Sequence, residues 1–235
     1  MALTNNSINL RVLARLLAYP DAALQADLPD LRQALHAQRA LAKPRLTELD
    51  ALVSLLANGD PLEHQAHYVE LFDRGRATSL HLFEHVHGDS RERGPAMIDL
   101  TQTYEKAGLL LAPGELPDYL PVVLEFVSTQ PPKEARAFLG EMTHIFSAIF
   151  SALCQRNSAY ASVLGALLEL SGEKALAVKV TADEAIDASW QEPVVFDGCS
   201  VKGQAKPGQA QPLHFVKNES ARTNGSAATA TGVSA

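Results

Sequence analysis

Residues 138–153 read FLGEMTHIFSAIFSAL. Apolar side chains recur in this stretch at helical spacing over about four turns. They are Phe138, Met142, Ile145, Phe146, Ile149 and Leu153. Pro131 and Pro132 stand just before the stretch, where proline is favoured at the start of a helix. The pattern therefore predicts one long amphipathic helix that is opened by the two prolines and faces a protein core.

Helical spacing also governs the rest of the folded part. Apolar stripes of the same period occupy residues 12–17, 49–56 and 160–168. Pro20 should end the first of these helices, and Asp60-Pro61 with Glu63 gives an N-cap, an N1 proline and an N3 glutamate for another. Runs typical of strands are too short and too few to build a sheet. The predicted fold class is all-α.

The composition divides the chain near residue 196. The chain has 235 residues, and residues 197–235 are small, polar and poor in side chains that fill a core. We therefore expect a single globular multi-helix domain over residues 1–196 and a disordered C-terminal tail over 197–235. The whole chain has a net charge of -7, and the tail carries four basic and two acidic residues, so the predicted domain carries -9.

This acidity bears on the partners of the domain. Nucleic acid and anionic membrane surfaces are bound mainly through lysine and arginine, so both are excluded as expected partners. An acidic body instead attracts basic partners. A helical regulator that reads DNA would need a basic recognition helix, and no helix-turn-helix pattern is present.

The cysteine count and the N-terminus indicate the compartment. Cys154 and Cys199 are the only cysteines and form no metal-binding or redox motif. Residues 1–17 show no basic leader ahead of an apolar run, and no stretch has the length and apolarity of a membrane span. We expect a reduced, cytoplasmic protein without direct membrane insertion.

Unusual residues concentrate between Tyr68 and Gly94. Tyr68, Leu71 and Phe72 share one helical face, which spacing alone assigns most simply to the core. Four arginines follow, and in an acidic body they should pair with carboxylates such as Asp73, Glu84, Asp89 or Glu92. The four are Arg74, Arg76, Arg91 and Arg93.

Residues 81–85 read HLFEH, which matches the letters of an inverted zinc-peptidase motif. His81, Glu84 and His85 would share one face of a helix, with the histidines as ligands and the glutamate as general base. A catalytic zinc site needs a third protein ligand, and the sequence offers none at a suitable position. A metal-dependent hydrolase is thus the alternative function, and we expect no bound metal.

Residues 115–121 read ELPDYLP and should connect two helical halves. Pro117 and Pro121 stiffen this connection, and Asp118 is a natural N-cap for the helix that contains residues 122–126. The stretch is interpreted either as a well-capped interhelical connection or as one wall of a groove.

Three segments together carry a resemblance to a known family. Residues 68–100, YVELFDRGRATSLHLFEHVHGDSRERGPAMIDL, are similar to the NarJ-type assembly chaperones of respiratory nitrate reductase. RLLAYPD at 15–21 and ELPDYLP at 115–121 resemble the same family in the same order. The likeness covers about residues 8–196.

The resemblance implies an all-helical, cytoplasmic redox-enzyme maturation chaperone with no catalysis and no cofactor of its own. It implies that the chain binds the N-terminal segment of the apo catalytic subunit, keeps that subunit competent for molybdenum cofactor insertion and delays its docking to the membrane anchor. Such a chaperone is not part of the finished enzyme. Molybdenum cofactor biosynthesis proteins are further candidate partners, and a monomer is expected.

The resemblance also implies where the client binds. The wider family has an E-x-P-x-D-H motif, which Glu115, Pro117 and Asp118 resemble, with Tyr119 where a histidine is usual. We expect a basic amphipathic helix of the client to lie in a groove of this acidic body. The predicted client-binding residues are Tyr68, Leu71, Phe72, Arg74, Arg76, Glu115, Pro117, Asp118 and Tyr119.

Overall fold

The computed structural model describes residues 6–88 and 90–178, which form ten α-helices and one short 3-10 helix. The elements are α1 (Ser7–Leu17), α2 (Ala22–Gln38), α3 (Lys43–Ala57), α4 (Pro61–Phe72), η1 (Arg76–Thr78), α5 (Leu82–Val86), α6 (Arg93–Lys106), α7 (Leu120–Thr129), α8 (Pro132–Glu141), α9 (Thr143–Gln155) and α10 (Ala161–Ser171). No strand occurs in these described residues, so the all-α prediction is confirmed for them.

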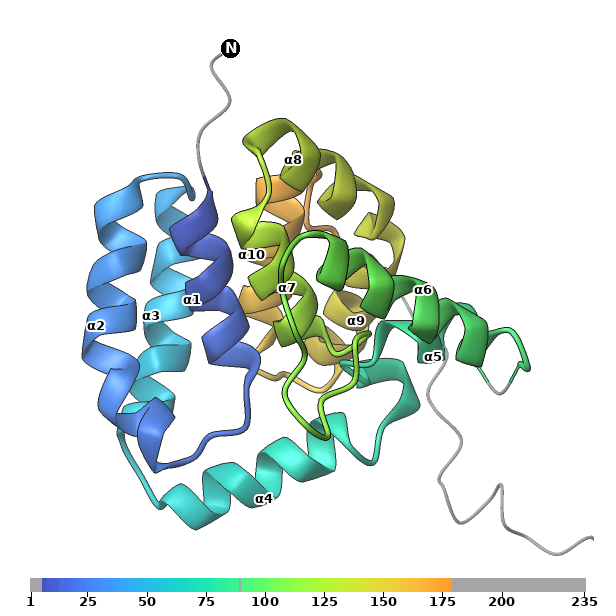
Figure 1. The fold of residues 1–235 in the computed structure, drawn as a ribbon. Helices are drawn as coiled ribbons and strands as arrows, with labels where there is room; N and C mark the ends of the chain where they lie inside the picture. The colour runs from blue at the N-terminus through green and yellow to red at the C-terminus, as the bar shows by residue number, and fades with distance from the viewer. Residues whose placement is uncertain (1–5, 89, 179–235) are drawn as a thin grey trace, which may run out of the picture. The chain divides into compact units, whose positions relative to one another are not determined.

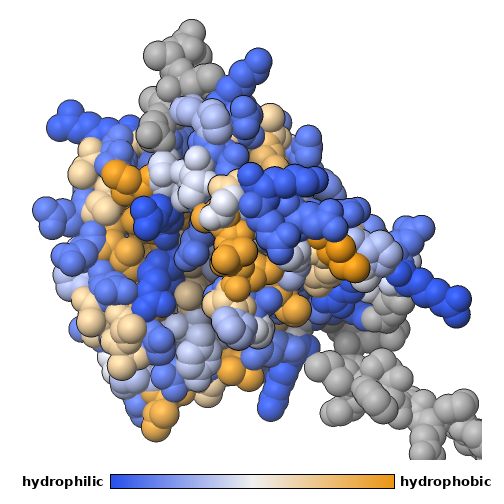
Figure 2. All heavy atoms as spheres, viewed as in Figure 1, coloured by the Kyte–Doolittle hydropathy of each residue, from blue (hydrophilic) through white to orange (hydrophobic). Residues whose placement is uncertain are grey.

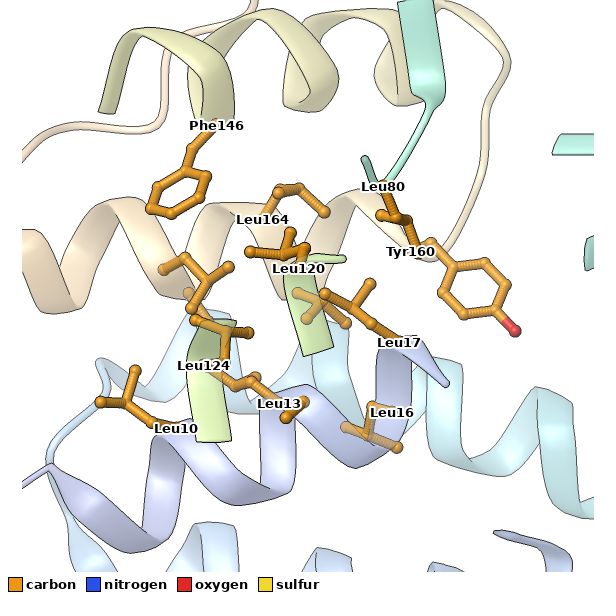
Figure 3. Packing of buried hydrophobic residues seen from close by; sticks show 14 of the residues in the cluster. Leu10, Leu13, Leu16, Leu17, Leu80, Leu120, Leu124, Phe146, Tyr160 and Leu164 are labelled. Carbon is orange, nitrogen blue, oxygen red and sulfur yellow. The ribbon is translucent and has the colours of Figure 1, made fainter. Parts of the chain in front are cut away.

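Helix α1 is the centre of the packing. It lies against α7 on one side and against α2 on the other, while α10 packs on α9 and α3 (Figure 1). Leucines of α1 and α7 meet Phe146 of α9 and Leu164 of α10 in one continuous core (Figure 3). Helix α4 runs along the bottom of the view in Figure 1, and α5 and α6 lie at the right of that view.

The long helix expected from residue 132 onward is wrong, because the structure has two helices there. α8 and α9 meet at Met142, where the helical path bends by 60°. Gly140 is a weak helix former, and its carbonyl oxygen accepts a hydrogen bond from the Thr143 hydroxyl at 2.9 Å. The backbone N–H of Met142 bonds to Leu139, which is a tighter turn than the α-helical one. The bend turns the apolar face of α9 into the core.

Two of the other expected helix boundaries are confirmed. The Asp60 side chain accepts a hydrogen bond from the Leu62 N–H at 2.9 Å, with Pro61 as the first residue of α4. Helix α1 ends at Leu17, shortly before Pro20. In both places the local sequence signal agrees with the tertiary packing.

The chain clusters into two units, Met1–Ile186 and Asp187–Ala235. All described residues belong to the first unit, so the predicted domain boundary at 196 and the predicted tail lie outside them. Within the described part, none of the helices is by itself long and apolar enough to cross a membrane. Among residues 6–88 and 90–178, the bent pair α8 and α9 meets the length and apolarity criterion when its two helices are taken together.

Candidate functional site

Residues 107–119 connect α6 to α7 and are called the α6–α7 link here. The link has two parts that differ in how they are held. Residues 117–119, the inner segment, are fixed by hydrogen bonds to α4, α5 and α6. Residues 108–115, the outer segment, form an exposed loop beside a cavity. Figure 1 shows the whole link as a long loop next to α7.

Backbone contacts tie the inner segment to the start of α5. The Leu82 N–H donates to the carbonyl oxygen of Asp118 at 3.0 Å, and the Leu120 N–H donates to the carbonyl oxygen of Leu80 at 2.8 Å. This short antiparallel pairing is centred on His81 and Tyr119. On the other side, the buried Tyr104 hydroxyl of α6 donates to the carbonyl oxygen of Pro117 at 2.7 Å.

Asp118 caps α5, not α7, which corrects the prediction that it would start the helix after the link. Its carboxylate is fully buried, at 0% exposure, and accepts a hydrogen bond from the Phe83 N–H at 3.2 Å. Helix α7 has no side-chain cap. Among the first N–H groups of α7, that of Leu120 donates to the Leu80 carbonyl oxygen, and Pro121 has no N–H to satisfy.

Two basic side chains lie beside the buried carboxylate. His81 Nδ1 lies 3.4 Å from one oxygen of Asp118, and Arg93 Nη2 lies 3.8 Å from the other. The hydrogen bond to Asp118 raises the pKa of His81 above its ordinary value, and burial of the imidazole opposes this shift. Arg93 also pairs with Glu84 at 3.5 Å, which confirms the expected pairing of an arginine of this region with Glu84.

These contacts separate the three residues of the zinc-peptidase letters. His81 precedes α5 and faces Asp118, Glu84 faces Arg93, and His85 Nε2 lies 2.9 Å from the Ser79 carbonyl oxygen. The expectation that all three lie on one helix is therefore wrong. No group of three or more metal-ligating side chains is found among residues 6–88 and 90–178.

Tyr119 connects the link to the core through its hydroxyl group. Tyr68 donates its hydroxyl proton to the Leu17 carbonyl oxygen at 2.7 Å, so at the 3.0 Å contact between the two tyrosine hydroxyls Tyr119 is the donor. The Tyr119 ring also packs on the His81 ring, with centroids 5.4 Å apart. Burial raises the pKa of Tyr119, so the phenol keeps the proton that it donates.

Tyr68, Leu71 and Phe72 are buried in the hydrophobic core. The Tyr68 ring contacts Phe72 and Tyr160, with ring centroids 4.8 Å and 6.0 Å apart. The idea that these three side chains line an open groove does not agree with this burial, since their faces are covered by other side chains. The core assignment is confirmed. Arg74 and Arg76, by contrast, are exposed.

A cavity of about 480 Å³ lies along α1 and α7, and the outer segment of the link forms one side of it. Its apolar lining comes from Tyr104, Leu109, Leu110, Leu111, Val122 and Phe126. Glu115 and Glu125 add two exposed carboxylates, and Arg11 and Arg15 lie on α1. The charge of Arg15 is compensated by Asp21 and Asp27, at 3.3 Å and 3.0 Å.

A second cavity of about 360 Å³ lies between α6 and the link. It is lined by Met97, Ile98, Thr101, Gln102, Glu105, Leu116 and Pro117. On the face drawn in Figure 2, hydrophobic side chains gather over α6 and the connection to α7, with hydrophilic side chains around them. The predicted groove wall at residues 115–121 therefore stands between two hollows.

The sequence reasoning missed the outer segment and the lining from α1, α6 and α7. One signal was available, namely three consecutive leucines at 109–111 between Gly108 and Pro113-Gly114. Such a run in a connection between helices is an exposed apolar feature that needs an explanation.

Comparison with known proteins assigns the chain to a family. Residues 17–164 match the model of the family described as nitrate reductase delta subunit. The chain belongs to this family. The matched residues include the whole α6–α7 link, the second cavity and all of the first cavity except its α1 arginines.

Individual relatives agree with the delta-subunit family assignment. The chain is 44% identical over 198 residues to the nitrate reductase molybdenum cofactor assembly chaperone NarJ of Escherichia coli K12, covering 80% of this chain and 84% of that protein. It is 32% identical over 169 residues to a Bacillus subtilis protein named as a NarJ chaperone on a provisional basis, covering 72% and 90%.

A solved structure supports the fold. It is a protein from Archaeoglobus fulgidus assigned provisionally to the redox enzyme maturation proteins, with a TM-score of 0.53 and 19% identity. The match covers 71% of this chain and 94% of that one. At this identity the likeness establishes the helical fold alone.

Proposed function

We propose that this protein is an assembly chaperone of respiratory nitrate reductase that binds the N-terminal segment of the apo catalytic subunit. Its binding keeps that subunit competent for insertion of the molybdenum cofactor and delays its docking to the membrane anchor. The proposal rests on the family and on its curated relatives, which are named molybdenum cofactor assembly chaperones. The protein acts in the cytoplasm as a monomer, is not an enzyme and holds no cofactor of its own.

The cavity along α1 and α7 carries the site of this proposal. Its lining is suited to the apolar face of an amphipathic helix, because aliphatic and aromatic side chains of α6, α7 and the link meet there. A hollow of about 480 Å³ takes a few large side chains of such a helix, while the rest of the helix lies across the opening.

The charges around the cavity favour a basic client. Glu115 and Glu125 are exposed at its edge and outnumber the exposed Arg11, while Arg15 is already paired with two aspartates. Across the described residues, lysine and arginine number 15 and aspartate and glutamate number 20, so the body as a whole is acidic. Acidic groups on the rim accelerate the encounter with a basic helix and select against acidic ones.

The inner segment supports this site without touching the client. Asp118 and Pro117 are buried, and Tyr119 is held by Tyr68, so these residues keep the link in place beside the cavity. We therefore assign client contact to Glu115 among the motif-like residues. Pro117, Asp118 and Tyr119 act as positioning residues.

Titration calorimetry with a synthetic peptide that copies the first residues of the nitrate reductase catalytic subunit tests the proposal. We expect a dissociation constant between micromolar and nanomolar, about -8 to -12 kcal/mol, which permits later release. A peptide of the same composition in scrambled order is the control for nonspecific attraction.

A matched pair of variants tests the location of the site. Val122→Ser alters a half-buried lining residue of the cavity, and Val86→Ser makes the same change at an exposed valine on α5 outside it. We expect about tenfold weaker binding for Val122→Ser and no change for Val86→Ser, since a buried contact with a methyl-bearing side chain is lost only in the first. Equal affinity of both variants would move the site elsewhere, and no binding by the wild type would refute the proposal.

A further inference from the structure

Leu110 is the most exposed large hydrophobic side chain of the described residues, at 85% exposure. It stands in the middle of the outer segment, between two leucines that are half-buried against the cavity. A single exposed leucine on a surface is ordinary. Leu110 differs because it is contiguous with the apolar lining of a cavity and extends that lining outward.

The backbone around Leu110 is fixed at both ends and unsupported in the middle. On one side, the Leu109 N–H donates to the Tyr104 carbonyl oxygen at 2.9 Å and Gly108 adopts a φ of +79°. Leu110 and Leu111 make no backbone hydrogen bond to any other residue in the described part of the chain. Leu110 and Leu111 thus lie in a part of the loop that no backbone hydrogen bond among the described residues holds in place.

The other end of this span is a closed turn. The Glu115 N–H donates to the Ala112 carbonyl oxygen at 3.1 Å, and Gly114 has a φ of +90°, as a type II turn with Pro113 requires. The Glu115 carboxylate accepts the Ala112 N–H at 3.0 Å and closes the turn a second time. A Cβ added at Gly108 or Gly114 would meet no atom within 4 Å, so neither glycine is packed against a neighbour.

We propose that residues 109–111 are a movable wall of the cavity and that Leu110 is the side chain that closes on the client. This inference rests on the proposed function and adds the specificity-determining contact to it. The occupant is an amphipathic helix with a basic face. Its apolar face buries Leu110 against Leu109 and Leu111, while its basic side chains meet Glu115 and Glu125 on the same rim.

The order of residues in the outer segment favours this occupant. The exposed Leu110 and the exposed carboxylate of Glu115 lie within six residues of each other, on either side of the turn. This arrangement is complementary to a helix whose apolar and basic faces are adjacent. Glu115 holds the turn that positions the wall and also supplies charge to the rim. One residue therefore couples the shape of the wall to its electrostatic preference.

The test compares Leu110→Ser with Leu62→Ser by calorimetry, in the full chain and with the same synthetic N-terminal peptide. Leu62 is another strongly exposed leucine, at 71% exposure on α4, and it does not line the cavity. We expect Leu110→Ser to bind about tenfold more weakly or worse and Leu62→Ser to bind as the wild type does, since burial of one leucine has an effect of at least this size. Unchanged thermal unfolding of both variants excludes misfolding as the cause.

The possible outcomes are separable. If the wild type binds the peptide and Leu110→Ser binds equally well, the movable wall is refuted and the proposed function stands. If the wild type binds no peptide, the proposed function fails and this inference falls with it. Sedimentation of the wild type and Leu110→Ser covers the remaining occupant: a wild-type dimer that the substitution dissociates would show that Leu110 is covered by a second copy, which overturns the proposal.

Discussion

The two segments of the α6–α7 link are adjacent in sequence and opposite in character. The inner segment is buried and held by hydrogen bonds to three helices, with a carboxylate at 0% exposure at its centre. The outer segment carries an exposed leucine and an exposed carboxylate over a span with few backbone hydrogen bonds. The conspicuous motif residues Pro117, Asp118 and Tyr119 are thus held by other parts of the fold, while the proposed client contacts lie in the plainer segment beside them.

The largest expected effect on the free energy of unfolding comes from Asp118→Ala in the inner segment, with Glu115→Ala in the outer segment as its comparison. Asp118→Ala leaves the Phe83 N–H without its acceptor and removes the buried negative charge beside His81 and Arg93. We expect it to lower the free energy of unfolding by about 3 kcal/mol. Glu115→Ala removes an exposed carboxylate and should change it by less than about 0.5 kcal/mol. Urea denaturation measures both.

Similar losses for the two alanine variants would abolish the proposed distinction. Asp118→Asn sharpens it, because asparagine keeps an acceptor for Phe83 and removes only the charge. If Asp118 met a basic client side chain, this variant would bind the peptide about 2 kcal/mol more weakly. Since the carboxylate is buried, we expect unchanged peptide affinity in the variant at temperatures where it is folded.

The next effect concerns the support of the inner segment by α6. Tyr104→Phe deletes the hydroxyl that donates to the buried Pro117 carbonyl oxygen and should cost about 1–2 kcal/mol of unfolding free energy. Tyr19→Phe is the matched control, because Tyr19 is exposed and should lose less than about 0.5 kcal/mol. A Tyr104→Phe protein as stable as the control would show that the link does not depend on this bond.

A smaller effect follows from the raised pKa of His81. Because the folded state binds this proton more tightly than the unfolded state, the His81–Asp118 contribution is fully present below the unfolded pKa of about 6.5 and is lost as the pH rises through the folded pKa. The melting temperature of the wild type should thus exceed that of His81→Gln more at about pH 6 than at about pH 8.5. His67→Gln, on an exposed position of α4, is the control for the loss of a histidine side chain.

The smallest effect concerns charge on the outer segment. Glu115→Gln keeps an oxygen that can accept the Ala112 N–H and removes only the negative charge. We expect peptide binding to weaken about twofold at low salt, with unchanged stability and a weaker dependence of affinity on salt. A salt dependence equal to that of the wild type would remove Glu115 from the set of client contacts.

The fold was predictable where local and tertiary signals agree. The stripe of α9 and the Asp60 cap of α4 could be read directly because each depends on neighbours in sequence. The bend at Met142 could not, because Gly140 alone weakens a helix only slightly and the final geometry depends on packing α9 into the core. The apolar side chains keep their helical spacing across Met142, so this spacing does not indicate that the helix is interrupted there.

The position of the connection between two helices was predictable from sequence, and its contacts were not. Prolines and acidic residues cluster at 115–121, which predicts a stiff connection there, while its role as a wall of the client groove stays a prediction. The prediction that Asp118 caps α7 was wrong, because its carboxylate accepts a hydrogen bond from the Phe83 N–H, 35 residues away in sequence. The position of Asp118 just before α7 gives no sign of this partner. Tyr68, Leu71 and Phe72 were offered as groove residues, yet helical spacing gives a face and not the element that covers it.

Native-state hydrogen exchange on the full chain tests the division of the link most directly. The account predicts slow exchange for the amides of Leu82, Phe83 and Leu120, which the link pairing engages, and fast exchange for Leu110 and Leu111. Added client peptide should slow exchange in the outer segment and leave the inner segment as it was. Equal exchange in both segments of the free protein, or peptide protection confined to the inner one, would contradict the account.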